Sequence, residues 1–421
     1  MNAAACCKAT AARGVGDRSA NGRELADIVR RYGPEYRRDN RLSPDQSKTL
    51  NAIEACRTAA LGGHADSCPR CGYKRYSYNS CRNRHCPKCQ TLTKARWIEA
   101  RKADLLPAHY FHVVFSLPHE LNALVLYNRR TLINLLFSAA SKTLVDFGRN
   151  NLGGRLGFTM ILHTWDQKLN AHFHLHCLIA GGALVGDNAA SRRWVSTSDK
   201  FLFPVRALSK VFRGKFLAGL KAVAARGELT FPATPGNPGQ FNAMLGKLYG
   251  KSWSLYAKPP FDGPERTLEY LGRYTHRVAI SNNRILSIDN GTVRFNYRDR
   301  RDGDRIKIMS LAASEFIRRF CLHVLPTGLM RIRHFGFLAS RCKTAMLAQC
   351  RQALGVPKSQ PLLKTAKTAA QWMLALTGVD IEACPRCGHK PLQSIELPPI
   401  KPHHLPLGRG PPDIYTAAAT R

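Results

Sequence analysis

Six cysteines lie between residues 56 and 89, and their spacing constrains the fold of this chain more than any other feature. Two pairs have the form Cys-x-x-Cys, as CPRC at 68–71 and CPKC at 86–89. Two thiolates at this spacing on a tight turn converge on one tetrahedral Zn²⁺ with bonds of about 2.3 Å. A redox motif would need a thioredoxin-like βαβ context, which is missing here. The stretch is rich in turn formers and poor in apolar residues, so we expect a small module that zinc holds together.

The zinc module offers more candidate ligands than one zinc ion needs. Four ligands would fill one site and eight would fill two, and the spacing alone does not pair them. Cys384 and Cys387 with His389 have the form of a further half-site, near His403 and His404. A structural zinc site has no open position for water, so we expect this module to bind or position a partner. The candidate zinc ligands are Cys56, His64, Cys68, Cys71, Cys81, His85, Cys86 and Cys89.

The charge of the chain indicates what that partner is. Lys and Arg number 64 against 28 Asp and Glu, which gives a formal net charge of +36 and a pI near 10.2. Such an excess is typical of proteins that bind a polyanion, most often nucleic acid. Charged residues and proline interrupt the apolar stretches 117–127 and 132–147, so we expect no membrane span. The N-terminus has no apolar segment of useful length, and we expect a cytoplasmic protein.

Strand patterns and helix patterns are interleaved along the rest of the chain, which favours an α+β fold. The expected strands are 109–118, 157–167 and 172–185, and the expected helices are 24–38, 127–149 and 267–278. A basic, largely helical stretch covers about 204–250, and helices are expected again from the end of the hairpin to about residue 352. That hairpin spans 284–299 and is expected to turn at Asn290–Gly291.

HFHLH at 172–176 places three histidines at alternate positions of an apolar strand. Side chains at i and i+2 share one face of a strand with Cα atoms roughly 6.6 Å apart, so an adjacent pair can hold one metal ion. His172 and His176 lie about 13 Å apart on the same geometry and cannot share an ion directly. Taken alone, this pattern is more typical of buried, hydrogen-bonded histidines than of a metal site.

A third metal ligand is expected from a neighbouring strand. Gln167 ends the segment TWDQ and can fold back toward the histidines across a short turn at 169–171. Asp166 and His163 are the alternatives to Gln167 for this role.

YLGRYTHR at 270–277 places two tyrosines four residues apart, on one face of the expected helix. Arg273 and Arg277 lie close to Tyr270 and Tyr274 in the sequence, and a phenol beside cations ionises more easily. Such a phenol can attack a phosphodiester, and a metal ion held by two histidines would polarise the scissile phosphate. Two tyrosines at this spacing are by themselves more typical of core packing. A catalytic role is favoured because the two tyrosines occur together with the histidine strand, the zinc module and the positive charge.

These motifs together resemble one protein family. They occur in one order from about residue 24 to 390, as CRTAALGGH, SCRNRHCPKCQ, FSLPHEL, HFHLHCLIAGG, YLGRYTHRVAISN, RDRRDGDR, HVLPTGLMRIRHFGFLA and CPRCGH. They resemble the HUH-superfamily transposases of bacterial rolling-circle insertion sequences, insertion-sequence family ninety-one. Relatives often have Pro where this chain has Phe173, a departure that leaves the second histidine pair intact. The presence of both tyrosines favours the two-tyrosine branch of the family.

The resemblance implies roles for the histidines and tyrosines. By position, His174 and His176 would bind the catalytic Mg²⁺ or Mn²⁺, and Tyr270 and Tyr274 would be the nucleophiles. One tyrosine would form a 5′-phosphotyrosine and free a 3′-OH, and the other would cleave the target or the second end. The resemblance does not settle the third metal ligand. The remaining expected site residues are Gln167 for the metal, and Arg273, Arg277 and His172 for DNA.

The resemblance also implies a domain order and partners. An HUH endonuclease core, which is an antiparallel sheet flanked by helices, would follow the zinc module, and the module would recognise DNA. The partners would be single-stranded element ends and target DNA at the bacterial nucleoid, and the oligomeric state stays open. The expected boundaries are a disordered tail at 1–20, a helix and zinc module at 21–105, a catalytic domain at 106–350 with a basic helical insertion at about 204–250, and a basic, Pro-rich tail at 351–421.

Two other functions use part of the same motif set. A plasmid replication initiator or relaxase would share the nicking chemistry, although the leading zinc module and the lack of a GxxxxGK[ST] segment argue against helicase-fused forms. A non-catalytic zinc regulator of DNA would need the cysteines but neither the histidine strand nor the tyrosines.

Overall fold

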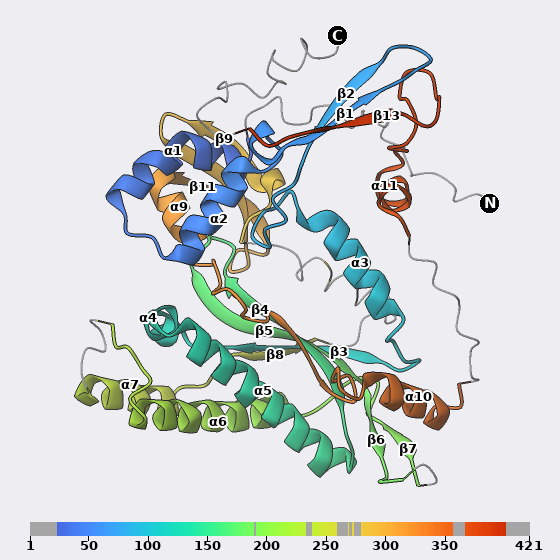
Figure 1. Cartoon of the computed structure of the whole chain (residues 1–421). Helices are drawn as coiled ribbons and strands as arrows, with labels where there is room; N and C mark the ends of the chain where they lie inside the picture. Colours follow the sequence, from blue (N-terminus) through green and yellow to red (C-terminus); the bar gives the residue numbers. More distant parts are fainter. Residues whose placement is uncertain are drawn as a thin grey trace, which may run out of the picture.

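A computed structural model describes residues 23–188, 191–232, 238–258, 268, 272, 279–356 and 367–400. The fold is mixed α and β with antiparallel sheets, as the sequence predicted (Figure 1). In the described part of the chain, no helix combines the length and apolar content that crossing a membrane requires.

The central sheet has five strands in the order β12-β4-β5-β3-β8, and each neighbouring pair is antiparallel. The predicted strands at 109–118 and 157–167 correspond to β3 and β4. The predicted strand 172–185 breaks at Gly181 into two strands, because β6 leaves the sheet to pair with β7. The bounds are β3 Tyr110–Ser116, β4 Gly157–Trp165, β5 Ala171–Ala180, β6 Gly182–Val185, β7 Arg193–Ser196, β8 Leu255–Lys258 and β12 Ile332–Gly336.

Helices cover one face of this sheet (Figure 1). They are α4 (Asn122–Tyr127), α5 (Arg129–Leu152), α6 (Val205–Ala225) and α7 (Pro238–Gly250). Alternate residues of β5, among them Phe173 and Leu175, join this core. Phe212 and Phe216 of α6 join it too, so the basic stretch predicted as an insertion at about 204–250 contributes to the main core.

A second core lies beside the sheet, between α1 (Leu25–Asp39), α2 (Pro44–Ala55), α9 (Ala313–Cys321) and the sheet β11-β10-β9. The hairpin of β9 (Ile285–Asp289) and β10 (Thr292–Asp299) turns at Asn290–Gly291, as predicted. Both turn residues have positive φ, 46° and 73°, which favours asparagine followed by glycine. The next segment, predicted as helical, begins instead with a third strand, β11 (Arg305–Ala312).

The zinc module consists of a small sheet and a helix. Strands β1 (Gly63–Ser67) and β2 (Lys74–Tyr78) form a hairpin, and α3 (Gln90–Lys102) leads from the module to the central sheet (Figure 1). Strand β13 (Gln393–Leu397) pairs with β1, so the C-terminal segment returns to the N-terminal module. The two helices between the central sheet and β13 are α10 (Lys343–Ala353) and α11 (Ala369–Thr377).

Candidate functional site

Three histidines meet on the face of the central sheet opposite the α5–α7 core. His163 of β4 lies directly across from His174 of β5 in the antiparallel register. His176 follows on the same face of β5, since strand side chains alternate. One ring nitrogen from each of the three lies within 4.8 Å of the others, and all three side chains are buried. We call this set the histidine cluster.

Neighbouring groups engage the Nδ1 atoms of the two β5 histidines. His174 Nδ1 lies 3.0 Å from the carbonyl oxygen of His172. His176 Nδ1 lies 2.8 Å from Nε2 of His112 on β3, and the two rings are stacked. Metal-binding histidines commonly use one ring nitrogen for such a contact, which fixes the tautomer and assigns the metal to the other nitrogen. These contacts leave Nε2 of His174 and of His176 as the ring nitrogen that could hold a metal ion.

Burial keeps the two β5 histidines of the cluster in the uncharged state that binds metal. Burial, followed by the charge of His163, holds the pKa of both His174 and His176 well below 6.5. Burial also lowers the pKa of His172, and Arg300 contributes to the shift of all three. A neutral imidazole carries the lone pair that a metal requires. Three imidazoles suit a divalent transition ion better than Mg²⁺, which prefers oxygen ligands.

The structure brings His163, rather than Gln167, to the β5 histidines. Gln167 is exposed in the turn between β4 and β5, where its backbone oxygen accepts a hydrogen bond from Arg284. The register places His163, one of the two alternatives, opposite His174. The other, Asp166, caps the turn by accepting from the backbone N–H groups of Lys168 and Asn170.

His112 was not among the predicted site residues. The strand that contains His112 was predicted, and alternation would have placed His112 on the polar face of β3. The pairing of β3 with β5, however, depends on strand order.

Replacing His112 with alanine should weaken Mn²⁺ binding by about 10–100-fold, because His176 loses the contact that fixes its ring. His112→Gln offers a polar partner again and should recover part of the affinity. Calorimetric titration with Mn²⁺ checks this, and an unchanged affinity in the alanine variant would contradict it.

The predicted catalytic tyrosines and their neighbours, Tyr270, Tyr274, Arg273 and Arg277, lie outside the described residues. Two positions of the same segment, Leu268 and Gly272, are described, and both are helical and buried. Leu268 packs in a small core with Ile161 and Leu178, which lie on the histidine face of β4 and β5.

Two groups of four cysteines form separate clusters. The Cys56 cluster contains Cys56, Cys81, Cys86 and Cys89, and the Cys68 cluster contains Cys68, Cys71, Cys384 and Cys387. The Sγ atoms of each cluster all lie within 4.8 Å of one another, with contacts of 3.4–3.6 Å in the Cys56 cluster and 3.5–3.6 Å in the Cys68 cluster. A tetrahedral zinc ion with bonds of about 2.3 Å needs sulfurs roughly 3.8 Å apart, so both clusters fit zinc.

The clusters correct the predicted zinc ligand set. Neither His64 nor His85 belongs to a cluster, and the half-site Cys384 and Cys387, predicted separately, completes the second one. His64 is exposed on β1. Burial, followed by the charge of Arg84, lowers the pKa of His85 to about 3, and the neutral ring accepts the backbone N–H of Leu325. His389 contributes its backbone oxygen to Cys384 N–H instead of a ring nitrogen to zinc.

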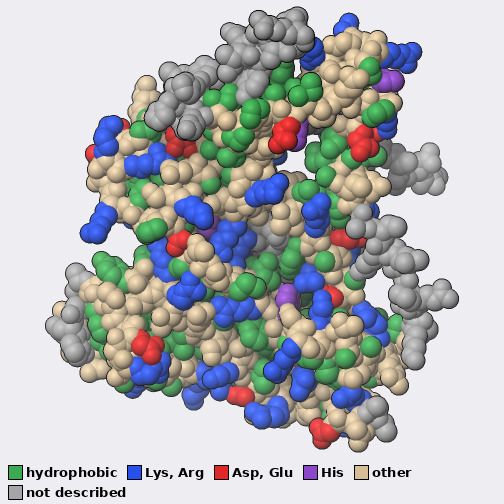
Figure 2. Space-filling view, viewed as in Figure 1, with side chains coloured by type: hydrophobic (Ala, Val, Ile, Leu, Met, Phe, Trp, Pro, Cys, Tyr) green, Lys and Arg blue, Asp and Glu red, His purple; other side chains and the backbone are tan. Residues whose placement is uncertain are grey.

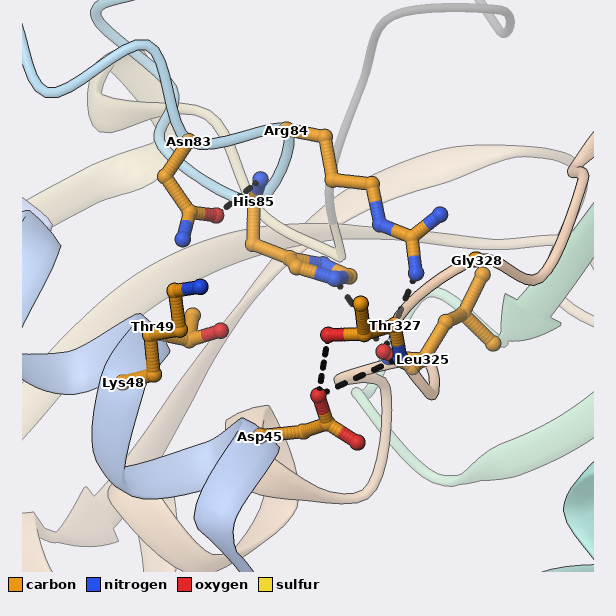
Figure 3. Close-up of a pocket in the computed structure, with 9 residues that line it drawn as sticks. All are labelled: Asp45, Lys48, Thr49, Asn83, Arg84, His85, Leu325, Thr327 and Gly328. Atoms are coloured by element: carbon orange, nitrogen blue, oxygen red, sulfur yellow. Dashed lines mark hydrogen bonds between the residues drawn. The ribbon is translucent and has the colours of Figure 1, made fainter.

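A cavity of about 260 Å³ marks the joint between the zinc module and the segment before β12 (Figure 3). Arg84, from the loop of the Cys56 cluster, donates to the carbonyl oxygens of Leu325, Pro326 and Leu329. Asp45 of α2 accepts from the backbone and side chain of Thr327. These contacts attach the zinc loop and α2 to the segment before β12, and no member of the histidine cluster lines the cavity.

Comparison with known proteins identifies the family to which this chain belongs. Residues 157–345 match the family described as "Putative transposase", and residues 28–117 match the family described as "Transposase zinc-binding domain". The chain is 45% identical over 384 residues to "Putative transposase y4qJ" of Sinorhizobium fredii, an alignment that covers 90% of this chain and 96% of the relative. The chain belongs to the IS91 family of transposases.

The transposase has more distant relatives as well. It is 29% identical over 356 residues to the transposase for insertion sequence element IS801 of Pseudomonas savastanoi pv. phaseolicola, covering 81% of each chain. A solved conjugative relaxase, TRWC in complex with oriT DNA, matches 56% of this chain and 95% of its own at 12% identity and a TM-score of 0.24. The family membership places the chain among transposases rather than among plasmid initiators, relaxases or regulators.

Proposed function

We propose that this IS91-family transposase nicks and transfers single-stranded DNA through a phosphotyrosine intermediate at the histidine cluster. The observation that carries the proposal is the meeting of three buried histidines on one sheet face, against which Leu268 of the tyrosine segment also packs. A divalent metal ion held by these imidazoles would polarise the scissile phosphate and stabilise the charge that develops on the departing 3′ oxygen.

The tyrosines supply the covalent chemistry in this proposal. The phenol oxygen of Tyr270 or Tyr274 attacks the scissile phosphorus, forms a phosphotyrosine bond and breaks the bond to the 3′ oxygen. The phenol proton ends on that oxygen, which leaves a 3′-OH. The phosphodiester energy is kept in the new bond, so a 3′-OH can later attack it and rejoin strands without an external energy source. Two tyrosines allow two ends to be held at once.

The charge of the surface supports a DNA partner. Lys and Arg side chains are spread over the face in Figure 2, including the hollow between its upper and lower parts, where few acidic side chains lie. Backbone phosphates bind such surfaces with release of counterions, so affinity should fall steeply with salt. The zinc module would recognise the element's end, while the basic surface holds the backbone.

The tip of the β10–β11 hairpin offers a cation for the scissile strand. Lys307 forms ion pairs with Asp299 and Asp302 in this hairpin, and Arg305 pairs with Asp302. Within the described part of the chain, Arg300 and Arg301 form no ion pair and are exposed. The hairpin is held beside the β4–β5 turn, since Lys168 Nζ lies 5.0 Å from the ring centroid of Tyr297.

Arg300→Ala should lower the nicking rate by about tenfold, whereas Arg301→Ala should change it by less than about twofold. The physical reason is proximity: the charge of Arg300 lies close enough to the β5 histidines to lower their pKa, so its guanidinium can reach a phosphate bound at the cluster. Initial rates on a single-stranded oligonucleotide compare the two neighbours directly. Equal effects of the two substitutions would contradict the role of Arg300.

A plasmid nicking assay tests the proposed function. Supercoiled plasmid that carries the element's end, incubated with the transposase and Mn²⁺, should yield nicked circles bound covalently to protein. The double variant Tyr270→Phe with Tyr274→Phe should bind the DNA and leave it supercoiled, because each phenol oxygen is removed and little volume changes. Nicking by this double variant, or no nicking by the unaltered protein, would contradict the proposed function.

A further inference from the structure

Helix α3 connects the zinc module physically to the histidine face of the central sheet. It begins at Cys89, a member of the Cys56 cluster, which is the N-cap residue of the helix. Near its other end, Arg101 Nη1 lies 3.1 Å from Nε2 of His334 on β12, and the Nδ1 of that ring lies 2.8 Å from Thr159 Oγ1 on β4. The helix is therefore attached at both ends.

The same helix meets the tyrosine segment. A Cβ added to Gly272 would lie 2.3 Å from Cδ1 and 2.8 Å from Cγ1 of Ile98, and 3.4 Å from Cε of Lys94. Real side chains do not approach this closely, so the backbone at Gly272 rests on the Ile98 side chain of α3, and a larger residue at 272 would force that side chain to move. Trp97, on the same helix, packs against the core that contains Leu268.

The same face of this segment also meets the sheet, because Leu268 and Gly272 are both helical and lie four residues apart. Leu268 is 2% exposed and belongs to one core with Ile161 and Leu178. Ile161 lies opposite His176 in the β4–β5 register and two residues before His163, on the same strand face. The segment therefore contacts α3 at Gly272 and the core on the histidine face of the sheet at Leu268, two positions that flank Tyr270 in the sequence.

We propose that the face of α3 formed by Lys94, Trp97 and Ile98 is a seat that positions the nucleophile segment relative to the histidine cluster. Ile98 and Gly272 are positioning residues, and their contact sets the distance between helix and segment. This inference rests on the proposed tyrosine chemistry. It gives the zinc module a second task besides DNA recognition, because the Cys56 cluster fixes the start of the helix that carries the seat.

A pair of compensating substitutions tests the seat. Gly272→Val adds three carbon atoms at the contact, and Ile98→Ala removes three. The readout is the rate of covalent adduct formation between full-length, Mn²⁺-loaded transposase and a single-stranded oligonucleotide that carries the element's end. Gly272→Val should slow this rate by about 10–100-fold with DNA affinity and zinc content unchanged, since a small displacement of a reacting group has an effect of this size. Ile98→Ala combined with Gly272→Val should recover most of the rate.

A matched glycine controls for the cost of valine in a helix. Gly246 lies in α7 with nothing within 4 Å of an added Cβ, and Gly246→Val should change the rate by less than about twofold. An unchanged rate in Gly272→Val would overturn the seat. If Gly272→Val unfolds, the double variant with Ile98→Ala provides the test. A double variant that folds again but does not recover the rate of adduct formation also overturns the seat. An unaltered protein that forms no adduct would overturn the proposed function instead.

Discussion

His174→Ala should abolish measurable Mn²⁺ binding and slow nicking by more than about a hundredfold. The removal leaves two imidazoles of three, and the loss of a ligand should exceed the 10–100-fold effect of a residue that only supports one. His163→Ala should have an effect of the same size, since His163 completes the cluster. Calorimetric titration with Mn²⁺ and initial nicking rates measure the two consequences separately.

Two controls make this result specific. Gln167→Ala, in the exposed β4–β5 turn, should leave Mn²⁺ affinity within about twofold of the unaltered protein. His64→Ala removes an exposed histidine outside all three clusters and should behave in the same way. If Gln167→Ala lost as much Mn²⁺ affinity as His163→Ala, the result would contradict the three-histidine site and would support Gln167 as a metal ligand.

Replacing Cys384 and Cys387 together with serine should lower the zinc content from two ions per chain to one, because the Cys68 cluster loses half of its ligands. The pairing of β13 with β1 should weaken with it, since the same segment carries both features. Elemental analysis reports the zinc content, and amide hydrogen exchange at β1 reports the release of β13. The Cys56 cluster has its own four cysteines and should keep its ion.

Cys342→Ser is the matched control for this experiment. Cys342 is half-buried and lies outside both cysteine clusters, so its replacement should leave two zinc ions and normal exchange at β1. Two zinc ions retained after the loss of Cys384 and Cys387 would show that the Cys68 cluster does not bind zinc through the C-terminal pair.

Local patterns predicted much of this molecule because they depend on near neighbours in the sequence. The alternation in β5 placed His174 and His176 on one face, and the Asn290–Gly291 turn set the β9–β10 hairpin. Cysteine spacing predicted both N-terminal zinc half-sites. Each of these features is decided within a few residues, where strand and turn geometry leave few choices.

Long-range pairings could not be predicted in this way. Cys68 and Cys71 find their partners at Cys384 and Cys387, more than 300 positions away, and one isolated Cys-x-x-Cys carries no sign of its partner. His163 joined the cluster because the β4–β5 hairpin has a register that places it opposite His174. His112 and the seat on α3 depend on strand order and on helix docking, which follow from the packing of the whole chain.

Mapping the covalent adduct tests the phosphotyrosine mechanism most directly. A single-stranded oligonucleotide across the element's end is incubated with transposase and Mn²⁺, digested with trypsin and analysed by mass spectrometry. Trypsin separates the tyrosines, since Tyr270 lies in TLEYLGR and Tyr274 in YTHR. We predict one of these peptides carrying the 5′ phosphate of the downstream fragment, and an upstream fragment that ends in a 3′-OH. An adduct on any other residue, a 3′-phosphate linkage, or cleavage without an adduct would contradict the mechanism.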